Sequence, residues 1–519
     1  MLILLTFFLL ALSAAMVIAI RIMQPEFRFA WLITTSGALL AWLSVWLWQV
    51  FLPLTLRLSV WKPETLFADS PVFVADGLAW VYGLALVTLA VASLLTAVAR
   101  PGFPQLLAWA GTLGLTAIGL LATLANNPLT LVLVWTALDL TELILQLRSV
   151  NEPRLSQRVV TAFAIHVGGT GMLMWASLVS LSTGTRMNFE NMPPEVGIYL
   201  LLAASLRLGI FPLHLPFSAE SGLRRGFGTS LRLVSAASSL VPLGRIPAGA
   251  VSPLTSTLLT LTALAALYGG WMWLRANNDL NGRPFWLLGM GALSVASALR
   301  GNPVGSAAWG VALVLSGTAL FLTSIQDSQL KRLLLLGVWG LTALPFSPTA
   351  SGWQSGVATA WGFWPFFLVS QALLIGGYIR HALRPSKGSF HYQPIWSQNL
   401  YTAGIILPLA VLFVLGLWGW PGAFRPGNWP ASLAAVLLSG GGLWIWPRLR
   451  LPAPRAHWVR PSSPTWLDTL YRFFMAIYEM AGSLLRAFSA LLEGDGGILW
   501  TLIFLIIFVS LLTTGGKMP

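Results

Sequence analysis

The chain of 519 residues contains no cysteine. This absence excludes disulfide bonds, thiolate metal sites, iron-sulfur clusters and cysteine nucleophiles. Charged residues are also scarce, because Asp, Glu, Lys and Arg together make up only 9% of the chain, whereas soluble globular proteins carry roughly 25%. So few charges cannot cover a water-soluble body of this length. The deficit excludes soluble enzymes and disordered scaffolds, and it predicts that lipid surrounds most of the chain.

Apolar residues make up 56% of the chain. They gather in runs of the roughly 20 residues needed to cross a bilayer, which predicts an all-α polytopic membrane protein with about 16 transmembrane helices. The runs begin near Met1, Ala30, Phe73, Gln105, Leu129, Val159, Ile198, Thr229, Ser252, Phe285, Pro303, Leu333, Val357, Tyr401, Pro430 and Ile498. The runs between 285 and 350 are rich in glycine and interrupted.

The net charge of +14 would suggest nucleic acid as a partner if the basic residues were clustered on one domain. They are scattered through the short gaps instead, so no nucleic acid is expected. When successive gaps are assigned to alternate sides of the membrane, most Lys and Arg fall on one side, which is then cytoplasmic. We therefore expect a bacterial inner (cytoplasmic) membrane protein with both termini on the non-cytoplasmic side. The first run lacks a basic leader, which favours a permanent helix over a signal peptide.

The order of the runs predicts five segments. They are N-terminal transmembrane helices (1–125), a central core (126–380), C-terminal transmembrane helices (381–447), a basic linker with an amphipathic helix (448–495) and a final transmembrane helix (496–519). Apolar residues from Leu467 to Leu491 recur every three or four positions and form one stripe. This helix is expected to lie along the membrane surface, over its own chain or over a neighbouring subunit.

Ionisable side chains inside predicted spans are costly in hydrocarbon and therefore mark candidate functional sites. Asp139 and Glu142 form the only acid pair in the middle of a run, on neighbouring faces of one helix. His166 lies within the next run, as a proton carrier or as a neutral, hydrogen-bonded core imidazole. Asp76 begins the third run near the interface, where hydration lowers its cost.

Two prolines interrupt the seventh run. Pro212 and Pro216 predict a broken helix, and Arg207 and His214 flank the first of them, with Arg232 in the following run. Broken helices within a membrane are tolerated where they line a hydrated cavity or contact protein, which is typical of ion pathways.

Asp139 or Glu142 can supply the counter-charge that Arg207 needs beside this break. An acid, a base and a break fit a candidate proton relay formed by Asp139, Glu142, Arg207, His166 and His214. They fit a static buried salt bridge equally well, and arginine favours the static form because it stays protonated. No metal or cofactor site is expected.

Two segments carry a resemblance to a known family, NNPLTLVLVW (Asn126–Trp135) and LRLGIFPLHLPFSAESG (Leu206–Gly222). Supporting segments are FVADGLA in the third run, AFAIHVGG in the sixth, and the stretches Ala276–Ser294 and Leu330–Trp353. Together they resemble, over roughly residues 70 to 380, the antiporter-like membrane subunits of respiratory complex I (NADH:quinone oxidoreductase), membrane-bound hydrogenases and multi-subunit cation/proton antiporters. The tail is similar to that of the longest family member, in which a surface helix runs along the complex.

The chain departs from the family pattern at the ionisable positions. Where the family has a Glu after the Trp of the fifth span, Thr136 follows Trp135, and Arg207 replaces a family Lys. A family His in the eighth span falls near Ser235, and the eleventh span, 306–324, has no charged residue. A chain that lacks ionisable groups at so many of the family's positions can keep the fold and lose proton pumping.

The resemblance implies a membrane-arm subunit of a complex I-like energy-converting oxidoreductase, working with other membrane subunits in the lipid bilayer. Such a subunit contributes to proton or cation translocation coupled to electron transfer elsewhere, or serves as a non-conducting scaffold. It would have no redox or hydrolytic site and no cofactor of its own. The alternative is a stand-alone secondary transporter for ions or small solutes. A membrane transferase is disfavoured because the longest gaps offer no acidic or histidine cluster.

Overall fold

The computed structural model describes the chain in ranges separated by gaps. They are residues 1–24, 27, 29–58, 70–100, 106–149, 153–184, 186–215, 225–247, 254–325, 328–353, 362–384, 393–419 and 429–445. The predicted amphipathic helix and final span, between 448 and 519, lie outside these ranges, as does Pro216.

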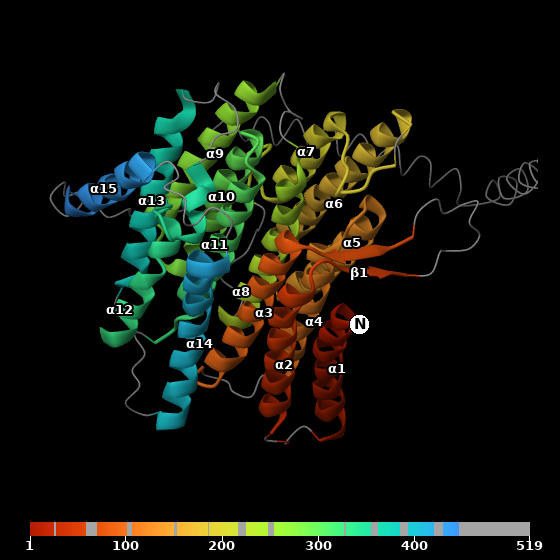
Figure 1. The fold of residues 1–519 in the computed structure, drawn as a ribbon. Coiled ribbons are helices and arrows are strands. Elements are labelled where there is room, and N and C mark those ends of the chain that lie inside the picture. The colour runs from red at the N-terminus through yellow and green to blue at the C-terminus, as the bar shows by residue number, and fades with distance from the viewer. Residues whose placement is uncertain are drawn as a thin grey trace, which may run out of the picture. The chain divides into compact units, whose positions relative to one another are not determined.

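Helices dominate the described part of the chain (Figure 1). The first eight are α1 (Leu2–Met23), α2 (Ala30–Phe51), α3 (Gly77–Ala97), α4 (Leu106–Leu124), α5 (Pro128–Ser149), α6 (Pro153–Ser182), α7 (Gly197–Arg207) and α8 (Arg225–Leu240). The others are α9 (Thr255–Arg275), α10 (Asp279–Leu299), α11 (Pro303–Leu322), α12 (Ser328–Leu336), α13 (Trp364–Ala382), α14 (Ile395–Val414) and α15 (Trp429–Ile445). In order, they match the predicted runs from the first to the one near Pro430, so the all-α polytopic fold is confirmed.

The number of membrane crossings is a separate matter. Nine of the described helices are long and apolar enough to span a bilayer alone. Others, such as α7 and α12, are short because the chain breaks within the expected run. The predicted total of about 16 crossings stays a prediction.

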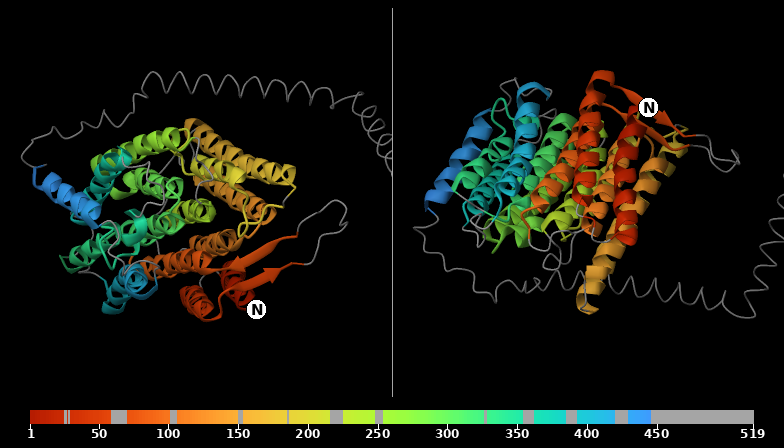
Figure 2. Two further views of the ribbon diagram at one scale, coloured as in Figure 1. Left: turned by 45° about the horizontal axis from the view of Figure 1, so that its top comes forward. Right: turned by 90° about the horizontal axis from the view of Figure 1, so that it is seen from below.

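The centre of the helical body is formed by α3 and α11. In each of these helices, 94% of the most apolar 18-residue stretch is buried. Their sequences are rich in Ala, Gly, Ser and Thr, and such small residues let helices approach closely without the hydrophobic drive that water provides. By contrast α1 and α2 lie at one edge and α15 at the opposite edge (Figure 2). Only 33% of the corresponding stretch of α1 is buried, so the remaining surface of this helix is available to lipid or to a partner protein.

One feature was not predicted, a small antiparallel pair of strands. The strands β1 (Leu54–Arg57) and β2 (Val72–Ala75) pair with Leu54 opposite Ala75. The pair stands at the end of the bundle where α3 begins, and Asp76 caps that helix by accepting a hydrogen bond from the Ala79 N–H at 2.8 Å. Each strand is only four residues long, so its alternation of side chains is too short to be recognised among the apolar runs around it.

Helix α7 ends earlier than the prolines suggested. Its last residue is Arg207, and Gly209 takes the left-handed conformation at φ 79°. The N–H of Ile210 then donates to the Ser205 carbonyl at 2.8 Å. The break is therefore present, as predicted, but it begins at the glycine, which adopts that conformation without steric cost.

A second break follows α12. The chain runs through the short 3₁₀ turns η4 (Trp339–Leu341) and η5 (Pro348–Trp353), with Ala343 and Phe346 at positive φ. Turn η5 packs against α11. The interrupted character predicted for this stretch is thus confirmed.

Candidate functional site

Helix α5 presents the two acids to the interior of the bundle. Asp139 is 2% exposed and Glu142 is 4% exposed, one helical turn apart. The side chains that bond to these acids come from the next three helices: His166 from α6, Arg207 from the end of α7 and Arg232 from the middle of α8. We call these five residues the charged cluster.

The pair of Asp139 and Arg207 is bidentate. Arg207 Nη1 donates to Asp139 Oδ2 at 2.6 Å, and Nη2 donates to Oδ1 at 2.7 Å. The guanidinium also donates from Nε to Ser239 Oγ at 3.1 Å and stacks 4.3 Å from the centroid of the Trp135 ring. Parallel hydrogen bonds of this kind are among the strongest in proteins. The sequence left open whether Asp139 or Glu142 pairs with Arg207, and the structure shows that it is Asp139.

Gly169 makes room for this pair. A Cβ atom at that position would lie 2.7 Å from Arg207 Cγ and 3.0 Å from the Ala203 carbonyl oxygen. At the neighbouring Gly168, a Cβ atom would meet only Leu206, at an ordinary 3.5 Å. The long side chain of Arg207 therefore passes α6 at Gly169, where a larger residue would collide with it.

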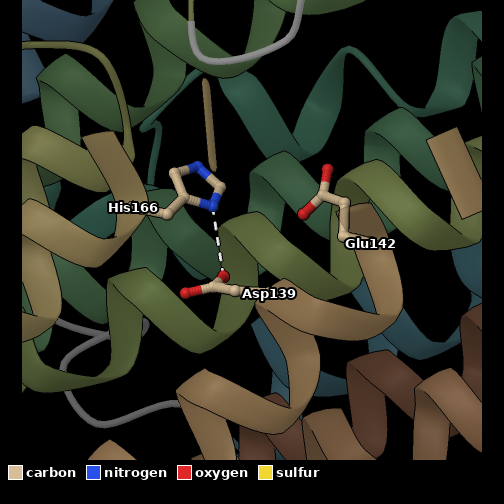
Figure 3. A group of neighbouring side chains, drawn as sticks. All are labelled: Asp139, Glu142 and His166. Carbon is tan, nitrogen blue, oxygen red and sulfur yellow. Dashed lines mark hydrogen bonds and ion pairs between the residues drawn. The ribbon is translucent and has the colours of Figure 1, made fainter. Parts of the chain in front are cut away.

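His166 is attached to the same carboxylate. Its Nδ1 lies 3.1 Å from Asp139 Oδ1, and the two side chains face one another in Figure 3. An ionised carboxylate only accepts, so Nδ1 carries the hydrogen of this bond. Asp139 thus orients both a fixed cation and a titratable ring.

Glu142 has its own arginine. Arg232 Nη1 donates to Glu142 Oε1 at 2.8 Å, and Gln146 Nε2 donates to the same oxygen at 2.6 Å. The other oxygen, Oε2, is buried and accepts no hydrogen bond from the described residues. Arg232 was noted in the sequence only as a charge in the eighth run. Its role as the partner of Glu142 was missed, although two acids on one helix required two counter-charges.

His214 does not join the charged cluster. Its Nδ1 lies 2.6 Å from the carbonyl oxygen of Pro212, within the loop that follows α7. Among the described residues, this ring makes no hydrogen bond to Asp139 or Glu142. Of the five predicted site residues, four lie in the charged cluster, and the His214 ring instead hydrogen-bonds within the loop after α7.

A small cavity of about 10 Å³ lies between α5 and α6 beside the cluster. Its lining residues are Asp139, Glu142, Leu143, Gln146, Val159, Ala162, Phe163 and His166. Ligand atoms of Asp139, Glu142 and His166 lie within 4.8 Å of one another, a spacing that a metal ion can use. Two guanidinium groups already balance the two carboxylates, however, and both oxygens of Asp139 accept from Arg207. These residues do not fit a cation.

The second break contains no comparable cluster in its described part. Helix α11 is uncharged, as expected, and Ser316 Oγ donates to the Gly337 carbonyl at 3.2 Å. The carbonyls exposed by the break are met by Thr349, which donates to Gly340 at 2.8 Å, and by Gln371, which donates to Leu341 at 2.8 Å. These two donors are a hydroxyl and an amide, and a buried cation joins them: Arg300 Nη2 donates to the Gly352 carbonyl in η5 at 3.2 Å. No Asp or Glu lies in η4 or η5.

No family model matches the sequence, and no curated protein matches it. Solved structures do. A chain of the Mrp complex from a Dietzia species superposes with a TM-score of 0.72 at 14% identity, covering 100% of this chain and 63% of that one. This chain thus spans less than two thirds of the length of that Mrp chain.

Two further assemblies contain similar chains. A chain of the membrane-bound sulfane sulfur reductase, an archaeal respiratory membrane complex, gives a TM-score of 0.62 at 12% identity over 98% of this chain and 99% of that one. A chain of respiratory complex I from Thermus thermophilus gives 0.60 at 20% identity over 85% of this chain and 100% of that one. The chain therefore has the antiporter-like membrane fold that its motifs resemble, a fold it shares with chains of an Mrp complex, a sulfane sulfur reductase and respiratory complex I.

Proposed function

We propose that this chain is a membrane subunit of a multi-subunit assembly that moves protons or cations across a bacterial inner membrane. Electron transfer in partner subunits supplies the driving reaction, as in a complex I-like oxidoreductase. The shared fold supports the assembly, because each of the three similar chains belongs to a membrane complex. A large apolar surface on α1, α2 and α6 supports contacts with lipid and neighbouring subunits.

The observation that carries the proposal is the charged cluster beside the α7 break. Two carboxylates and two arginines buried in a membrane bundle are costly, and such groups are retained where charge must move. Arg207 and Arg232 supply fixed positive charge. The groups that exchange protons are then Glu142 and His166, while Asp139 is held by Arg207.

Glu142 is the titrating acid in this proposal. Asp139 has both oxygens committed to Arg207. Glu142 uses only Oε1 for Arg232 and Gln146, and its Oε2 has no partner among the described residues. A proton can therefore be placed on Oε2 while the contact with Arg232 persists.

The test is purification of the tagged chain in a mild detergent with every protein that accompanies it, followed by proton pumping in vesicles. Glu142→Gln is expected to abolish pumping while electron transfer in the assembly continues. The matched control is Thr136→Ala on the same helix, since Thr136 is exposed and its hydroxyl bonds only to the Val132 carbonyl.

Two other results would overturn the proposal. If the assembly forms and Glu142→Gln pumps normally, the chain is a non-conducting scaffold. If the chain purifies alone and transports ions without partners, it is a stand-alone secondary transporter.

A further inference from the structure

The cavity between α5 and α6 has one polar group that the protein leaves unsatisfied, Glu142 Oε2. This oxygen is buried and accepts no hydrogen bond from the described residues, while the other oxygen of the same carboxylate accepts two. A buried carboxylate oxygen without a hydrogen-bond donor is unfavourable. The residue lines the cavity, so a small guest there can reach it.

The size of the cavity selects the guest. About 10 Å³ is room for roughly one water molecule. The remaining walls include apolar side chains from Leu143, Val159 and Phe163, which offer no ligands to a hydrated ion. The charges of Asp139 and Glu142 are balanced by Arg207 and Arg232, so the site has no excess negative charge to attract a cation.

We propose that the cavity binds a single water molecule that donates to Glu142 Oε2 and reaches the imidazole of His166. The ligand atoms of these two residues lie within 4.8 Å of one another, a separation that one bridging water spans with two ordinary hydrogen bonds. Figure 3 shows the His166 ring and the Glu142 carboxylate on adjacent helices above Asp139. The water joins the Asp139–Arg207 pair, through His166, to the Glu142–Arg232 pair.

The consequence is a defined proton step, and this part rests on the proposed function. A proton on the His166 ring passes to the water oxygen, while a hydrogen of that water passes to Glu142 Oε2. The water is regenerated, His166 becomes neutral and Glu142 becomes a neutral acid. Asp139 holds the ring in place through Nδ1, so it is a positioning residue.

Ala162 allows the site to be closed without touching a charge. It lines the cavity, and Ala162→Val adds two methyl groups, enough to fill the room of one water. The matched control is Ala164→Val on the same helix, at an exposed position outside the cavity lining. Both variants keep every member of the charged cluster.

The experiment is a high-resolution cryo-electron microscopy map of the full chain in nanodiscs, for the wild type and both variants. We expect one density peak within hydrogen-bond distance of Glu142 Oε2 in the wild type and in Ala164→Val, and none in Ala162→Val. Both Arg–carboxylate pairs should be visible in all three maps, which shows that Ala162→Val has folded. A wild-type map with resolved side chains and no peak, or a peak surrounded by four or more oxygens at cation distances, overturns the proposal.

Proton transfer is measured on the same variants within the purified assembly. Ala162→Val is expected to lower the rate of proton translocation at least about tenfold, and Ala164→Val to leave it unchanged. If the wild-type assembly moves no protons, the proposed function fails, while the map still decides whether the water site exists. If the water is lost and the rate is unchanged, the water site stands and the proton step is wrong.

Discussion

The two broken helices of this chain solve the same backbone problem with different chemistry. At the α7 break, Arg207 at the end of the helix donates to Asp139 and to Ser239, while the Ile210 N–H donates to the Ser205 carbonyl. At the α12 break, the neutral donors Thr349 and Gln371 bond to two of the exposed carbonyls, and Arg300 donates to the Gly352 carbonyl. An interrupted helix in a membrane therefore does not by itself require buried carboxylates, because hydroxyl, amide and guanidinium donors meet the carbonyls at the second break. The charges at α7 need a further reason, and ion movement is the one we propose.

The largest expected effect comes from removing one half of the bidentate pair. Asp139→Asn leaves the Arg207 guanidinium buried without its counter-charge. We expect the chain to lose about 3–5 kcal/mol of stability, measured by unfolding in mixed detergent micelles. The double variant Asp139→Asn with Arg207→Gln restores neutrality and should recover most of the loss. A double variant as unstable as the single one would mean that shape, and not charge balance, sets the cost.

A glycine substitution tests whether the pair depends on close packing. Gly169→Ala places a Cβ atom 2.7 Å from Arg207 Cγ and should cost about 1–3 kcal/mol in the same unfolding assay. Gly168→Ala is the control, because its Cβ atom meets Leu206 at 3.5 Å. Equal effects of the two alanines would show that the passage of Arg207 across α6 is not tightly packed.

The second break provides the matching experiment. Thr349→Val removes the hydroxyl that donates to the Gly340 carbonyl and accepts from the Ala343 N–H. The expected loss is about 1–3 kcal/mol, because buried backbone groups are left unsatisfied. Since no ionisable group is involved, this loss should be the same from pH 5 to pH 9. A strong pH dependence in calorimetric scans of this variant would contradict the view that Thr349 acts through uncharged hydrogen bonds alone.

The smallest effect is expected at the partly exposed pair of Asp76 and Arg245. Arg245 Nη1 lies 2.9 Å from Asp76 Oδ2, with the Asp76 side chain 33% exposed. Asp76→Asn keeps an oxygen for the α3 cap and loses the ion pair, which should cost less than about 1 kcal/mol. Asp76→Ala also loses the cap and should cost about 1 kcal/mol more. If Asp76→Asn proves as costly as Asp139→Asn, then burial does not explain the difference between the two pairs.

The sequence predicted the helices well, because runs of about 20 apolar residues have few alternatives in a bilayer. It also singled out Asp139, Glu142 and Arg207 as charges within predicted spans, and the structure brings these three into the charged cluster. It did not predict that Arg232 pairs with Glu142, because helix rotation and depth in the bundle are set by packing and not by spacing. The position of the α7 break was also missed, since Gly209 rather than Pro212 begins it. The strands β1 and β2 were hidden among apolar residues that read as ends of spans.

The central claim is that the break beside the charged cluster moves protons and that the second break is structural. The most direct measurement is the proton translocation rate per purified assembly in vesicles, for Glu142→Gln beside Thr349→Val. We predict that Glu142→Gln stops translocation in a fully assembled complex, while Thr349→Val retains the wild-type rate in the fraction that folds. Normal translocation by Glu142→Gln, or its loss in well-folded Thr349→Val, would contradict the account.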